Sequence, residues 1–522
     1  MSSSSSPRPS DGGSARHLSR RRLLQLGLAG SAVVGAGAAG SWLLGDGLGA
    51  RAAAVVDPHA PIVGATETSR YSTGRVVKRT LHAAPASIDL GGSTTRTSAF
   101  NDQVPGPELR LNVGDELRVR LVNGLPDPTT VHWHGSALRN DMDGVPDLTM
   151  SPVAPGGHFD YSFIAPDPGT YWYHPHVGVQ LDTGLQGALI VEDPNEKAYY
   201  DDEVVLVLDD WTDGMGEAPA DILARLGRDG MDMGGMDMDG MDMDMEGMMT
   251  TEAEPLGSDT GDVAYPAHVI NGQLPQAPVT VDARPGRRIR FRLINAGSDT
   301  AYRFAIGGHR LTVTHADGFE VRPVEVDTLI LGMGERYDVV VTTSDGVFPI
   351  VAVPEGKDDP AGAAVLKTSS GSAPVSSARP RELSGRMLAY ADLAPVDALA
   401  LPSRTPDREL DVTLQMIDGG RRWYINGAGY GDNDPLDVRA GERVRLNLRN
   451  QTMMFHPMHL HGHTFALAGS AGSGVRKDTV NVLPMQSLPV DLEAVNPGQW
   501  LLHCHNTYHH ELGMMAVLSY LA

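Results

Sequence analysis

Cysteine and basic residues are both scarce in this chain. Cys504 is the only cysteine among 522 residues, which excludes an intramolecular disulfide. The 42 Lys and Arg residues are outnumbered by 65 Asp and Glu residues, and the formal net charge is −23. Nucleic-acid binding is therefore disfavoured, because it requires a basic surface. This charge suits a soluble protein that handles cations.

Long amphipathic helices are also missing, and the one helical stretch that we expect is short and lies near 221–226. An uncharged run, 23–45, follows three arginines at 20–22, as in a twin-arginine export signal. Its many Gly and Ala residues make it weakly hydrophobic, so we expect cleavage near 50–54, with membrane anchoring as the alternative. No cysteine lies near residue 50, which excludes a lipoprotein anchor. We predict that 1–54 is a signal segment. The protein would then act outside the cytoplasm, in the cell envelope, in a periplasm or as a secreted protein, without a stable membrane partner.

One sequence pattern occurs three times, with turn glycines at Gly114, Gly286 and Gly441. Each glycine is followed by alternating apolar and polar residues that end at an asparagine, which is the pattern of a half-buried strand. The glycines are 172 and 155 residues apart, a spacing that fits whole domains rather than a solenoid. We predict an all-β fold of three β-sandwich domains, at 65–195, 196–370 and 385–522. A linker at 355–383 would join the second domain to the third.

Residues 231–249 form a low-complexity segment with nine Met, five Asp and one Glu. It has no aromatic or β-branched residue to pack, so we expect a mobile loop of the second domain. Thioethers bind soft Cu(I), and carboxylates attract cations. The composition favours copper handling, and the alternative is a merely acidic insertion.

The histidines gather in short clusters. In an extended strand, residues i and i+2 face the same side. Four His-x-His pairs therefore each present two imidazoles together, and eight imidazoles suffice for a cluster of metal ions. These pairs are His132 and His134, His174 and His176, His459 and His461, and His503 and His505.

A second metal set faces the other way. Cys504 stands between His503 and His505, so its side chain points to the opposite side of the strand. His456 lies an odd three residues before His459 and also faces away from the pairs. The ligand set of a blue electron-transfer copper is two His, one Cys and a weak axial Met. That set is available in His456, Cys504, His509 and Met514.

Other interpretations of these residues explain less. A structural zinc site closes with four ligands and has no use for eight paired imidazoles. A lone cysteine among histidines can be a buried thiol, but the spacing of His509 and Met514 after Cys504 is then unexplained. The complete set favours copper, with a short covalent route for electrons between the two metal groups.

The four clusters resemble those of the multicopper oxidase family, over essentially the whole chain after the signal segment. The similarity is greatest to bacterial copper-resistance oxidases, particularly those of actinobacteria, which carry a motif like 140–144 after the first cluster. The resemblance implies three cupredoxin-like Greek-key domains, the second of them copper-free. It also implies four copper ions: one type 1, one type 2 and a type 3 pair. The type 2 and type 3 ions would lie between the first and third domains.

The resemblance also implies a role for each residue that matches a family motif. His132 and His459 would hold the type 2 copper. Asp143 matches a carboxylate that supplies protons during oxygen reduction, although it can also brace a turn. The type 3 pair would be held by His134, His174, His176, His461, His503 and His505, and the type 1 copper by His456, Cys504, His509 and Met514.

Two positions depart from the copper-efflux members of the family. The residue after the last histidine ligand is usually acidic and is His510 here, followed by Glu511. The position four before His456 is also usually acidic and is Thr452 here, although Met454 fits a thioether contact to the substrate. Both the proton path and a dedicated Cu(I) site are therefore open questions at the level of sequence.

The activity that the resemblance implies is oxidation of Cu(I), and also of Fe(II) and phenols, coupled to the four-electron reduction of O₂ to water, in copper tolerance. The partners would be O₂ and small reductants, and a monomer is compatible with the sequence. The alternatives are a general laccase, a non-enzymatic copper-sequestering or scaffolding cupredoxin protein, and a copper nitrite reductase. Scaffold members have lost ligands whereas all twelve are present here, and nitrite reductases use a smaller ligand set.

Overall fold

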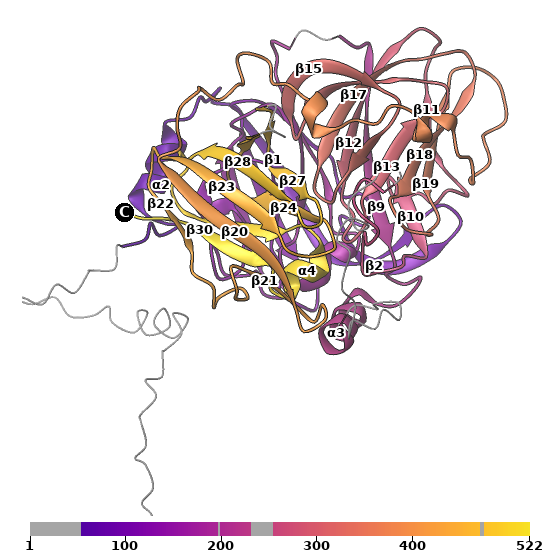
Figure 1. Cartoon of the computed structure of the whole chain (residues 1–522). Helices are drawn as coiled ribbons and strands as arrows, with labels where there is room; N and C mark the ends of the chain where they lie inside the picture. Colours follow the sequence, from indigo (N-terminus) through magenta and orange to yellow (C-terminus); the bar gives the residue numbers. More distant parts are fainter. Residues whose placement is uncertain (1–53, 197–198, 231–253, 470–473) are drawn as a thin grey trace, which may run out of the picture. The chain divides into compact units, whose positions relative to one another are not determined.

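The computed structural model describes residues 54–196, 199–230, 254–469 and 474–522. Residues 53–522 form one compact unit. Its described part contains six sheets, in three pairs that follow one another along the chain (Figure 1). We call these pairs the first sandwich (76–192), the second sandwich (202–367) and the third sandwich (408–520). The expected all-β fold is confirmed, whereas the exact domain limits stay predictions. Among the described residues, no helix has both the length and the apolar character needed to cross a membrane.

The first sandwich has two four-stranded sheets, in the orders β2-β1-β4-β6 and β3-β8-β7-β5. Side chains of both sheets share one buried cluster, which includes Leu81 and Leu117 of the first sheet and Trp133 and Leu189 of the second. The strands are β1 (Val76–Asp89), β2 (Thr94–Phe100), β3 (Leu109–Asn112), β4 (Glu116–Asn123), β5 (His132–His134), β6 (His158–Ile164), β7 (Gly169–His174) and β8 (Gly187–Glu192).

The second sandwich has sheets in the orders β10-β9-β12-β17-β14-β15 and β11-β19-β18-β13-β16. Its strands are β9 (Asp202–Trp211), β10 (Ala267–Ile270), β11 (Val279–Asp282), β12 (Arg288–Asn295), β13 (Tyr302–Ile306), β14 (Leu311–Ala316), β15 (Phe319–Val326), β16 (Leu329–Leu331), β17 (Arg336–Thr342), β18 (Val347–Pro354) and β19 (Gly362–Lys367). The expectation that all of 355–383 is linker is wrong, because β19 lies within it and pairs with β18.

The third sandwich has sheets in the orders β21-β20-β23-β28-β25-β26 and β22-β30-β29-β24-β27. Its strands are β20 (Arg408–Ile417), β21 (Arg422–Ile425), β22 (Leu436–Val438), β23 (Arg443–Asn450), β24 (His456–Leu460), β25 (Phe465–Leu467), β26 (Arg476–Lys477), β27 (Thr479–Val482), β28 (Ser487–Glu493), β29 (Gln499–Cys504) and β30 (Met515–Tyr520).

The three repeated patterns form the corresponding strands β4, β12 and β23, and each turn glycine has a positive φ. The strands β4 and β23 alternate between buried and more exposed side chains, as expected. The expectation of a half-buried strand is wrong for β12, which is buried on both faces. Its polar face carries Arg290 and Arg292, which are buried against Asp338, and Arg292 also donates a hydrogen bond to Thr170 of the first sandwich.

In the described parts of the chain, helices are few and short, as expected. The stretch near 221–226 lies in α3 (Pro219–Asp229), whose Ile222 and Leu226 are buried. Two further α-helices are α2 (Pro61–Thr68) and α4 (Thr507–Glu511). The described 3₁₀ turns are η1 (Asn140–Met142), η2 (Gly178–Asp182), η4 (Arg381–Ser384) and η5 (Tyr390–Asp392). Of these elements, η1 and α4 lie beside the functional site.

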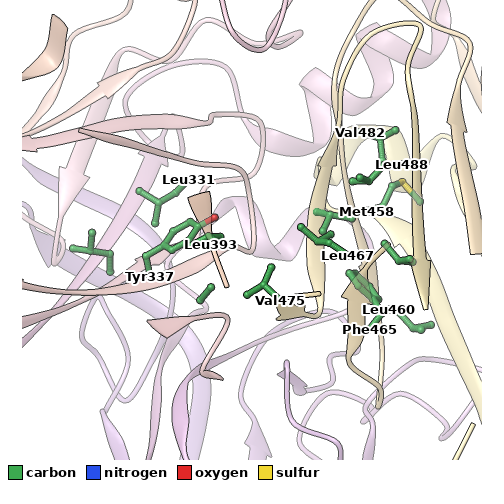
Figure 2. Close-up of a cluster of buried hydrophobic side chains, with 14 of the residues drawn as sticks. Leu331, Tyr337, Leu393, Met458, Leu460, Phe465, Leu467, Val475, Val482 and Leu488 are labelled. Carbon is green, nitrogen blue, oxygen red and sulfur yellow. The ribbon is translucent and has the colours of Figure 1, made fainter. Parts of the chain in front are cut away.

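Many buried apolar side chains of the second and third sandwiches belong to one continuous cluster. Figure 2 shows Leu331 and Tyr337 of the second sandwich on one side of it and Met458 and Leu460 of the third on the other. Dense packing of this kind holds neighbouring elements in fixed positions. The second sandwich is therefore joined firmly to the third, which carries eight of the 19 histidines.

Candidate metal centre

Strand pairing brings the four His-x-His pairs together. In the first sandwich, β5 and β7 are antiparallel neighbours, and His132 is opposite His174. In the third, β24 and β29 are antiparallel neighbours, and His459 is opposite His503. His461 and His505 follow directly after β24 and β29, which carry the first members of their pairs, and His176 lies two residues after the end of β7.

Cys504 joins two histidines on the other side of β29. Its Sγ lies 3.7 Å from Nδ1 of His456 and 3.6 Å from Nδ1 of His509, and the two nitrogens are 3.2 Å apart. The centre of such a triangle lies about 2 Å from each corner, close to the length of metal–nitrogen and metal–thiolate bonds. These three residues are buried, and their ligand atoms lie close enough together to hold one metal ion. The triangle fits the expected type 1 copper without rearrangement.

The eight paired imidazoles form one buried cluster between the first and third sandwiches. The ring centroid of His132 lies 3.7–6.0 Å from those of five others. Several triplets of these histidines have ligand atoms within 4.8 Å of one another. Burial lowers the pKa of most of the rings well below its usual value, because a charged imidazolium would lose its hydration. These are His134, His174, His176, His461, His503 and His505. These six rings are therefore held neutral, which is the form that binds metals.

Nitrogen atoms without partners make this cluster suited to copper. Buried polar atoms are normally hydrogen-bonded, so unpartnered ones call for an explanation. One ring nitrogen is buried without a partner in each of His132, His134, His174, His176 and His459, and both are in His505. The Nε2 atoms of His461 and His503 instead face each other at 3.1 Å. A set of neutral imidazoles with free inward nitrogens fits copper ions, because imidazole is a favoured ligand of copper.

Two aspartates lie against the outer nitrogens of these rings. Asp143 follows η1, and its Oδ2 lies 2.9 Å from Nδ1 of His461. Its backbone carbonyl oxygen lies 2.9 Å from Nδ1 of His132, and its Oδ1 lies 3.2 Å from the same nitrogen. The next residue, Gly144, has a φ of +84°, and a Cβ there would lie 1.9 Å from the carbonyl oxygen of Val131. Only glycine allows the loop to approach β5 this closely. The predicted residue Asp143 therefore lies at the cluster.

Asp478, which the sequence did not predict, contacts two other rings of the cluster, those of His134 and His459. Its Oδ1 lies 3.2 Å from Nε2 of His134 and 3.4 Å from Nδ1 of His459. Burial by itself raises the pKa of a carboxyl group, but the charge of Arg336 and its hydrogen bonds hold the pKa of Asp478 well below the usual range. Carboxylates that orient metal-binding histidines in this way also fix the tautomer of the ring. No local sequence pattern distinguishes Asp478, since it is placed by the pairing of β24 with β27.

A second missed carboxylate lies beside the Cys504 triangle. The Oδ2 atom of Asp262, from the loop before β10, lies 2.8 Å from Nε2 of His509. Thr452 takes the place of the family's usual acid, and its hydroxyl lies 2.8 Å from Nε2 of His456. The segment of Asp262 also forms a backbone bridge between Asp259 and Met454. The second sandwich therefore supplies an acid that the third sandwich lacks at position 452.

The remaining predicted residues also lie near the site. Met514 is buried, and its carbonyl oxygen accepts a hydrogen bond from the backbone N–H of Cys504. Met454 is buried in the cluster of apolar side chains that also contains Cys504. The ring of His510 lies 5.5 Å from that of His176 and 5.3 Å from that of His503, and its Nε2 lies 3.0 Å from Glu511. The segment 231–249 falls outside the described residues.

The chain resembles known copper oxidases along most of its length. Multicopper oxidase family models match residues 83–196, 202–371 and 404–521. The sequence is 47% identical over 460 residues to multicopper oxidase MmcO of Mycobacterium tuberculosis, covering 88% of this chain and 90% of that protein. It is 29% identical to a copper resistance protein A homolog of Pseudomonas syringae pv. tomato, covering 82% and 89%. The crystal structure of a laccase from Botrytis aclada matches with a TM-score of 0.70 at 26% identity, covering 87% and 89%.

The fold and the paired histidines define a copper-dependent oxidoreductase built from cupredoxin-like sandwiches. The chain belongs to the multicopper oxidase family. The expected family and enzyme class are thereby confirmed: it is an oxidoreductase that uses O₂ as the electron acceptor.

Proposed function

We propose that the protein couples the one-electron oxidation of a reduced substrate to the reduction of O₂. His456, Cys504, His509 and Met514 would hold a type 1 copper that supplies one-electron chemistry. The eight paired imidazoles would hold a type 2 copper and a type 3 pair that supply the chemistry of O₂ reduction. Four electrons and four protons convert one O₂ to two waters. The observation that carries this proposal is the opposite orientation of neighbouring residues on β29. Cys504 joins the triangle with His456 and His509, while His503 and His505 face the imidazole cluster.

Bound copper would supply the one-electron redox chemistry, and the protein's own side chains hold the ligands and exclude water. All twelve proposed copper ligands, from His132 to Met514, are buried. Asp143 is the candidate proton source, because its carboxylate lies against the outer nitrogens of both His132 and His461. Only the reduction of O₂ consumes protons, so a carboxylate at this place serves that half of the reaction.

We propose Cu(I) as the physiological electron donor, with copper tolerance as the role. Asp262 supports this, since its carboxylate contacts the outer nitrogen of His509, the ring that would carry electrons inward. Asp259 and Met454 are bridged next to it, so acidic and thioether groups lie on the same segment pair. Such groups attract a soft cation and offer it a ligand. The similarity to copper resistance proteins agrees with this choice. Fe(II) and phenols are secondary donors in this proposal.

The donor is tested by oxygen-uptake kinetics of the copper-loaded protein with Cu(I), Fe(II) and a phenol side by side. We expect the highest kcat/KM for Cu(I). A protein that consumes O₂ fastest with the phenol and barely with Cu(I) is a general laccase, the class to which several similar proteins belong. A protein that binds copper but consumes no O₂ with any donor is not an oxidase.

We also propose export by the twin-arginine route, directed by residues 1–54. The signal segment lies almost wholly outside the described residues, so its basis is the run of arginines at 20–22 and the uncharged stretch after it. Replacing the three arginines by lysine keeps the charge but removes the signal. We expect this variant to stay in the cytoplasm, and export at the normal level would contradict the proposal.

A further inference from the structure

Arg336 of the second sandwich contacts all three sandwiches. It begins β17 and is fully buried. Its Nη1 and Nη2 atoms donate hydrogen bonds of 2.6 Å to the two carboxylate oxygens of Asp478 in the third sandwich. Its Nε donates to the carbonyl oxygen of Thr170 in β7, at 3.1 Å. Strand β7 is the strand that ends in His174. One guanidinium therefore ties the two sandwiches that carry the paired histidines.

The anion held by Arg336 contacts one histidine from each side of the cluster. Asp478 reaches His134 of the first sandwich and His459 of the third. These two rings are stacked, with centroids 3.7 Å apart and an angle of 14° between their planes. In both rings the nitrogen that does not face Asp478 is buried and unpartnered. The hydroxyl of Thr479 donates to Oδ1 of Asp478 and lies 3.1 Å from the nitrogen of each ring that faces Asp478. Asp478 and Thr479 together therefore set the direction of two inward nitrogens.

Arg336 gives Asp478 an ion pair, and this distinguishes Asp478 from Asp143. Asp143 also bridges two stacked rings, those of His132 and His461. Within the described residues, however, Asp143 forms no ion pair with an arginine or lysine, whereas Asp478 is held through both of its oxygens. A guanidinium fork fixes the plane of a carboxylate, which a single point charge such as lysine does not. Only one of the two carboxylates is therefore locked in orientation.

The backbone beside Arg336 also packs against two rings of the imidazole cluster. Gly334 has a φ of +83°, and a Cβ added there would lie 2.9 Å from Cε1 of His134 and 2.9 Å from Cδ2 of His505. Arg336 donates a further hydrogen bond from Nη1 to the carbonyl oxygen of Gly334. The turn before β17 is thus held in contact with two rings by the same side chain.

We propose that Arg336 is a positioning residue for the imidazole cluster. The second sandwich carries none of the proposed copper ligands, yet it sets the orientation of His134 and His459 through Asp478 and packs against His134 and His505 through Gly334. This inference rests on the proposed assignment of these histidines as copper ligands. It gives the second sandwich a part in building the oxygen-reducing centre.

The test compares Arg336→Lys with Arg443→Lys in the full-length, copper-loaded protein. Arg443 is the matched control, because it is equally buried and pairs with Glu493 on β28. Both variants retain the charge but lose the guanidinium, which holds both oxygens of Asp478 in the first case and only Oε1 of Glu493 in the second. In Arg336→Lys we expect the type 2 signal in electron paramagnetic resonance to change, and copper binding at the cluster to weaken about 10- to 100-fold, as for other groups that orient metal ligands. The blue absorption of the type 1 copper should persist, and Arg443→Lys should match the wild type in both readouts.

Two further variants show whether Arg336 acts through Asp478. Asp478→Asn and the double variant with Arg336→Lys should lose copper affinity to the same extent, since the two residues act as one unit. Additive losses would overturn the inference, and so would a type 2 signal in Arg336→Lys identical to that of the wild type. If Arg336→Lys does not fold, Gly334→Ala tests the contact of the turn before β17 with His134 and His505, and an unperturbed cluster in that variant is the contrary result. A wild-type protein that shows no type 2 signal at all would instead overturn the proposed function.

Discussion

Replacing Asp262 by asparagine is expected to raise the reduction potential of the type 1 copper. The carboxylate is 2% exposed and lies 2.8 Å from Nε2 of His509, whose Nδ1 faces Cys504. A negative charge at this place stabilises oxidised copper more than reduced copper. The carboxylate lies roughly 7 Å from a metal bound at Nδ1, because the imidazole ring and a bond of about 2 Å intervene. Coulomb's law with an effective dielectric constant of about 20 then gives roughly 2.4 kcal/mol.

For a one-electron couple this energy corresponds to a rise of roughly 100 mV, since a tenfold change in equilibrium is about 59 mV. The assay is a redox titration of the blue absorption in wild type and Asp262→Asn. Asp259→Asn is the control, because Asp259 lies on the same loop but, among the described residues, makes no hydrogen bond to His509, and its effect should be smaller. An unchanged or lower potential in Asp262→Asn would refute the idea that this carboxylate acts on the copper through His509.

Four further outcomes are expected. Cys504→Ser should lose the intense blue colour and all oxidation of reducing substrates, because both depend on the thiolate; a blue variant would show that the type 1 assignment is wrong. Asp143→Asn should slow reoxidation by O₂ while leaving reduction of the type 1 copper by substrate nearly unchanged, as measured by stopped flow; equal slowing of both points to general damage. Replacing the nine Met of 231–249 by Leu should reduce Cu(I) oxidation at low copper and leave phenol oxidation unchanged; wild-type behaviour would make the thioethers irrelevant. Burial and nearby acidic groups raise the pKa of Asp259 to about 6, so anaerobic reduction of the protein by Cu(I) should slow as the pH falls through that value and the carboxyl becomes neutral. Asp259→Asn should flatten the pH profile of this rate near that value, and a pH profile unaffected by the substitution would exclude Asp259 from Cu(I) capture.

The architecture and the paired histidines follow from local patterns that the sequence displays openly. The turn glycines with alternating strands predict three sandwiches, and they form β4, β12 and β23. The two-residue period of a strand predicts that Cys504 and its neighbours His503 and His505 face opposite sides. The structure places them so, with Cys504 against His456 and His509.

The residues that surround the ligands could not be predicted in the same way. Asp262 and Arg336 reach the site only after separate sandwiches pack together, and Asp478 reaches it through the pairing of β27 with β24. No short-range spacing relates any of the three to the histidines. The burial of both faces of β12 has the same origin, because Arg290 and Arg292 are covered through contacts with distant carboxylates and with Thr170 of another sandwich. An alternating sequence pattern predicts which side chains of a strand share a face, but it does not predict which other elements pack against the polar face.

The most direct test of the proposed four-electron chemistry is the ratio of Cu(I) oxidised to O₂ consumed, measured together with peroxide in the copper-loaded protein. A multicopper oxidase with an intact type 2 and type 3 cluster should oxidise four Cu(I) for each O₂ and release no hydrogen peroxide. A ratio of two, with one hydrogen peroxide formed for each O₂, would mean that the eight imidazoles do not hold an oxygen-reducing cluster of the proposed kind.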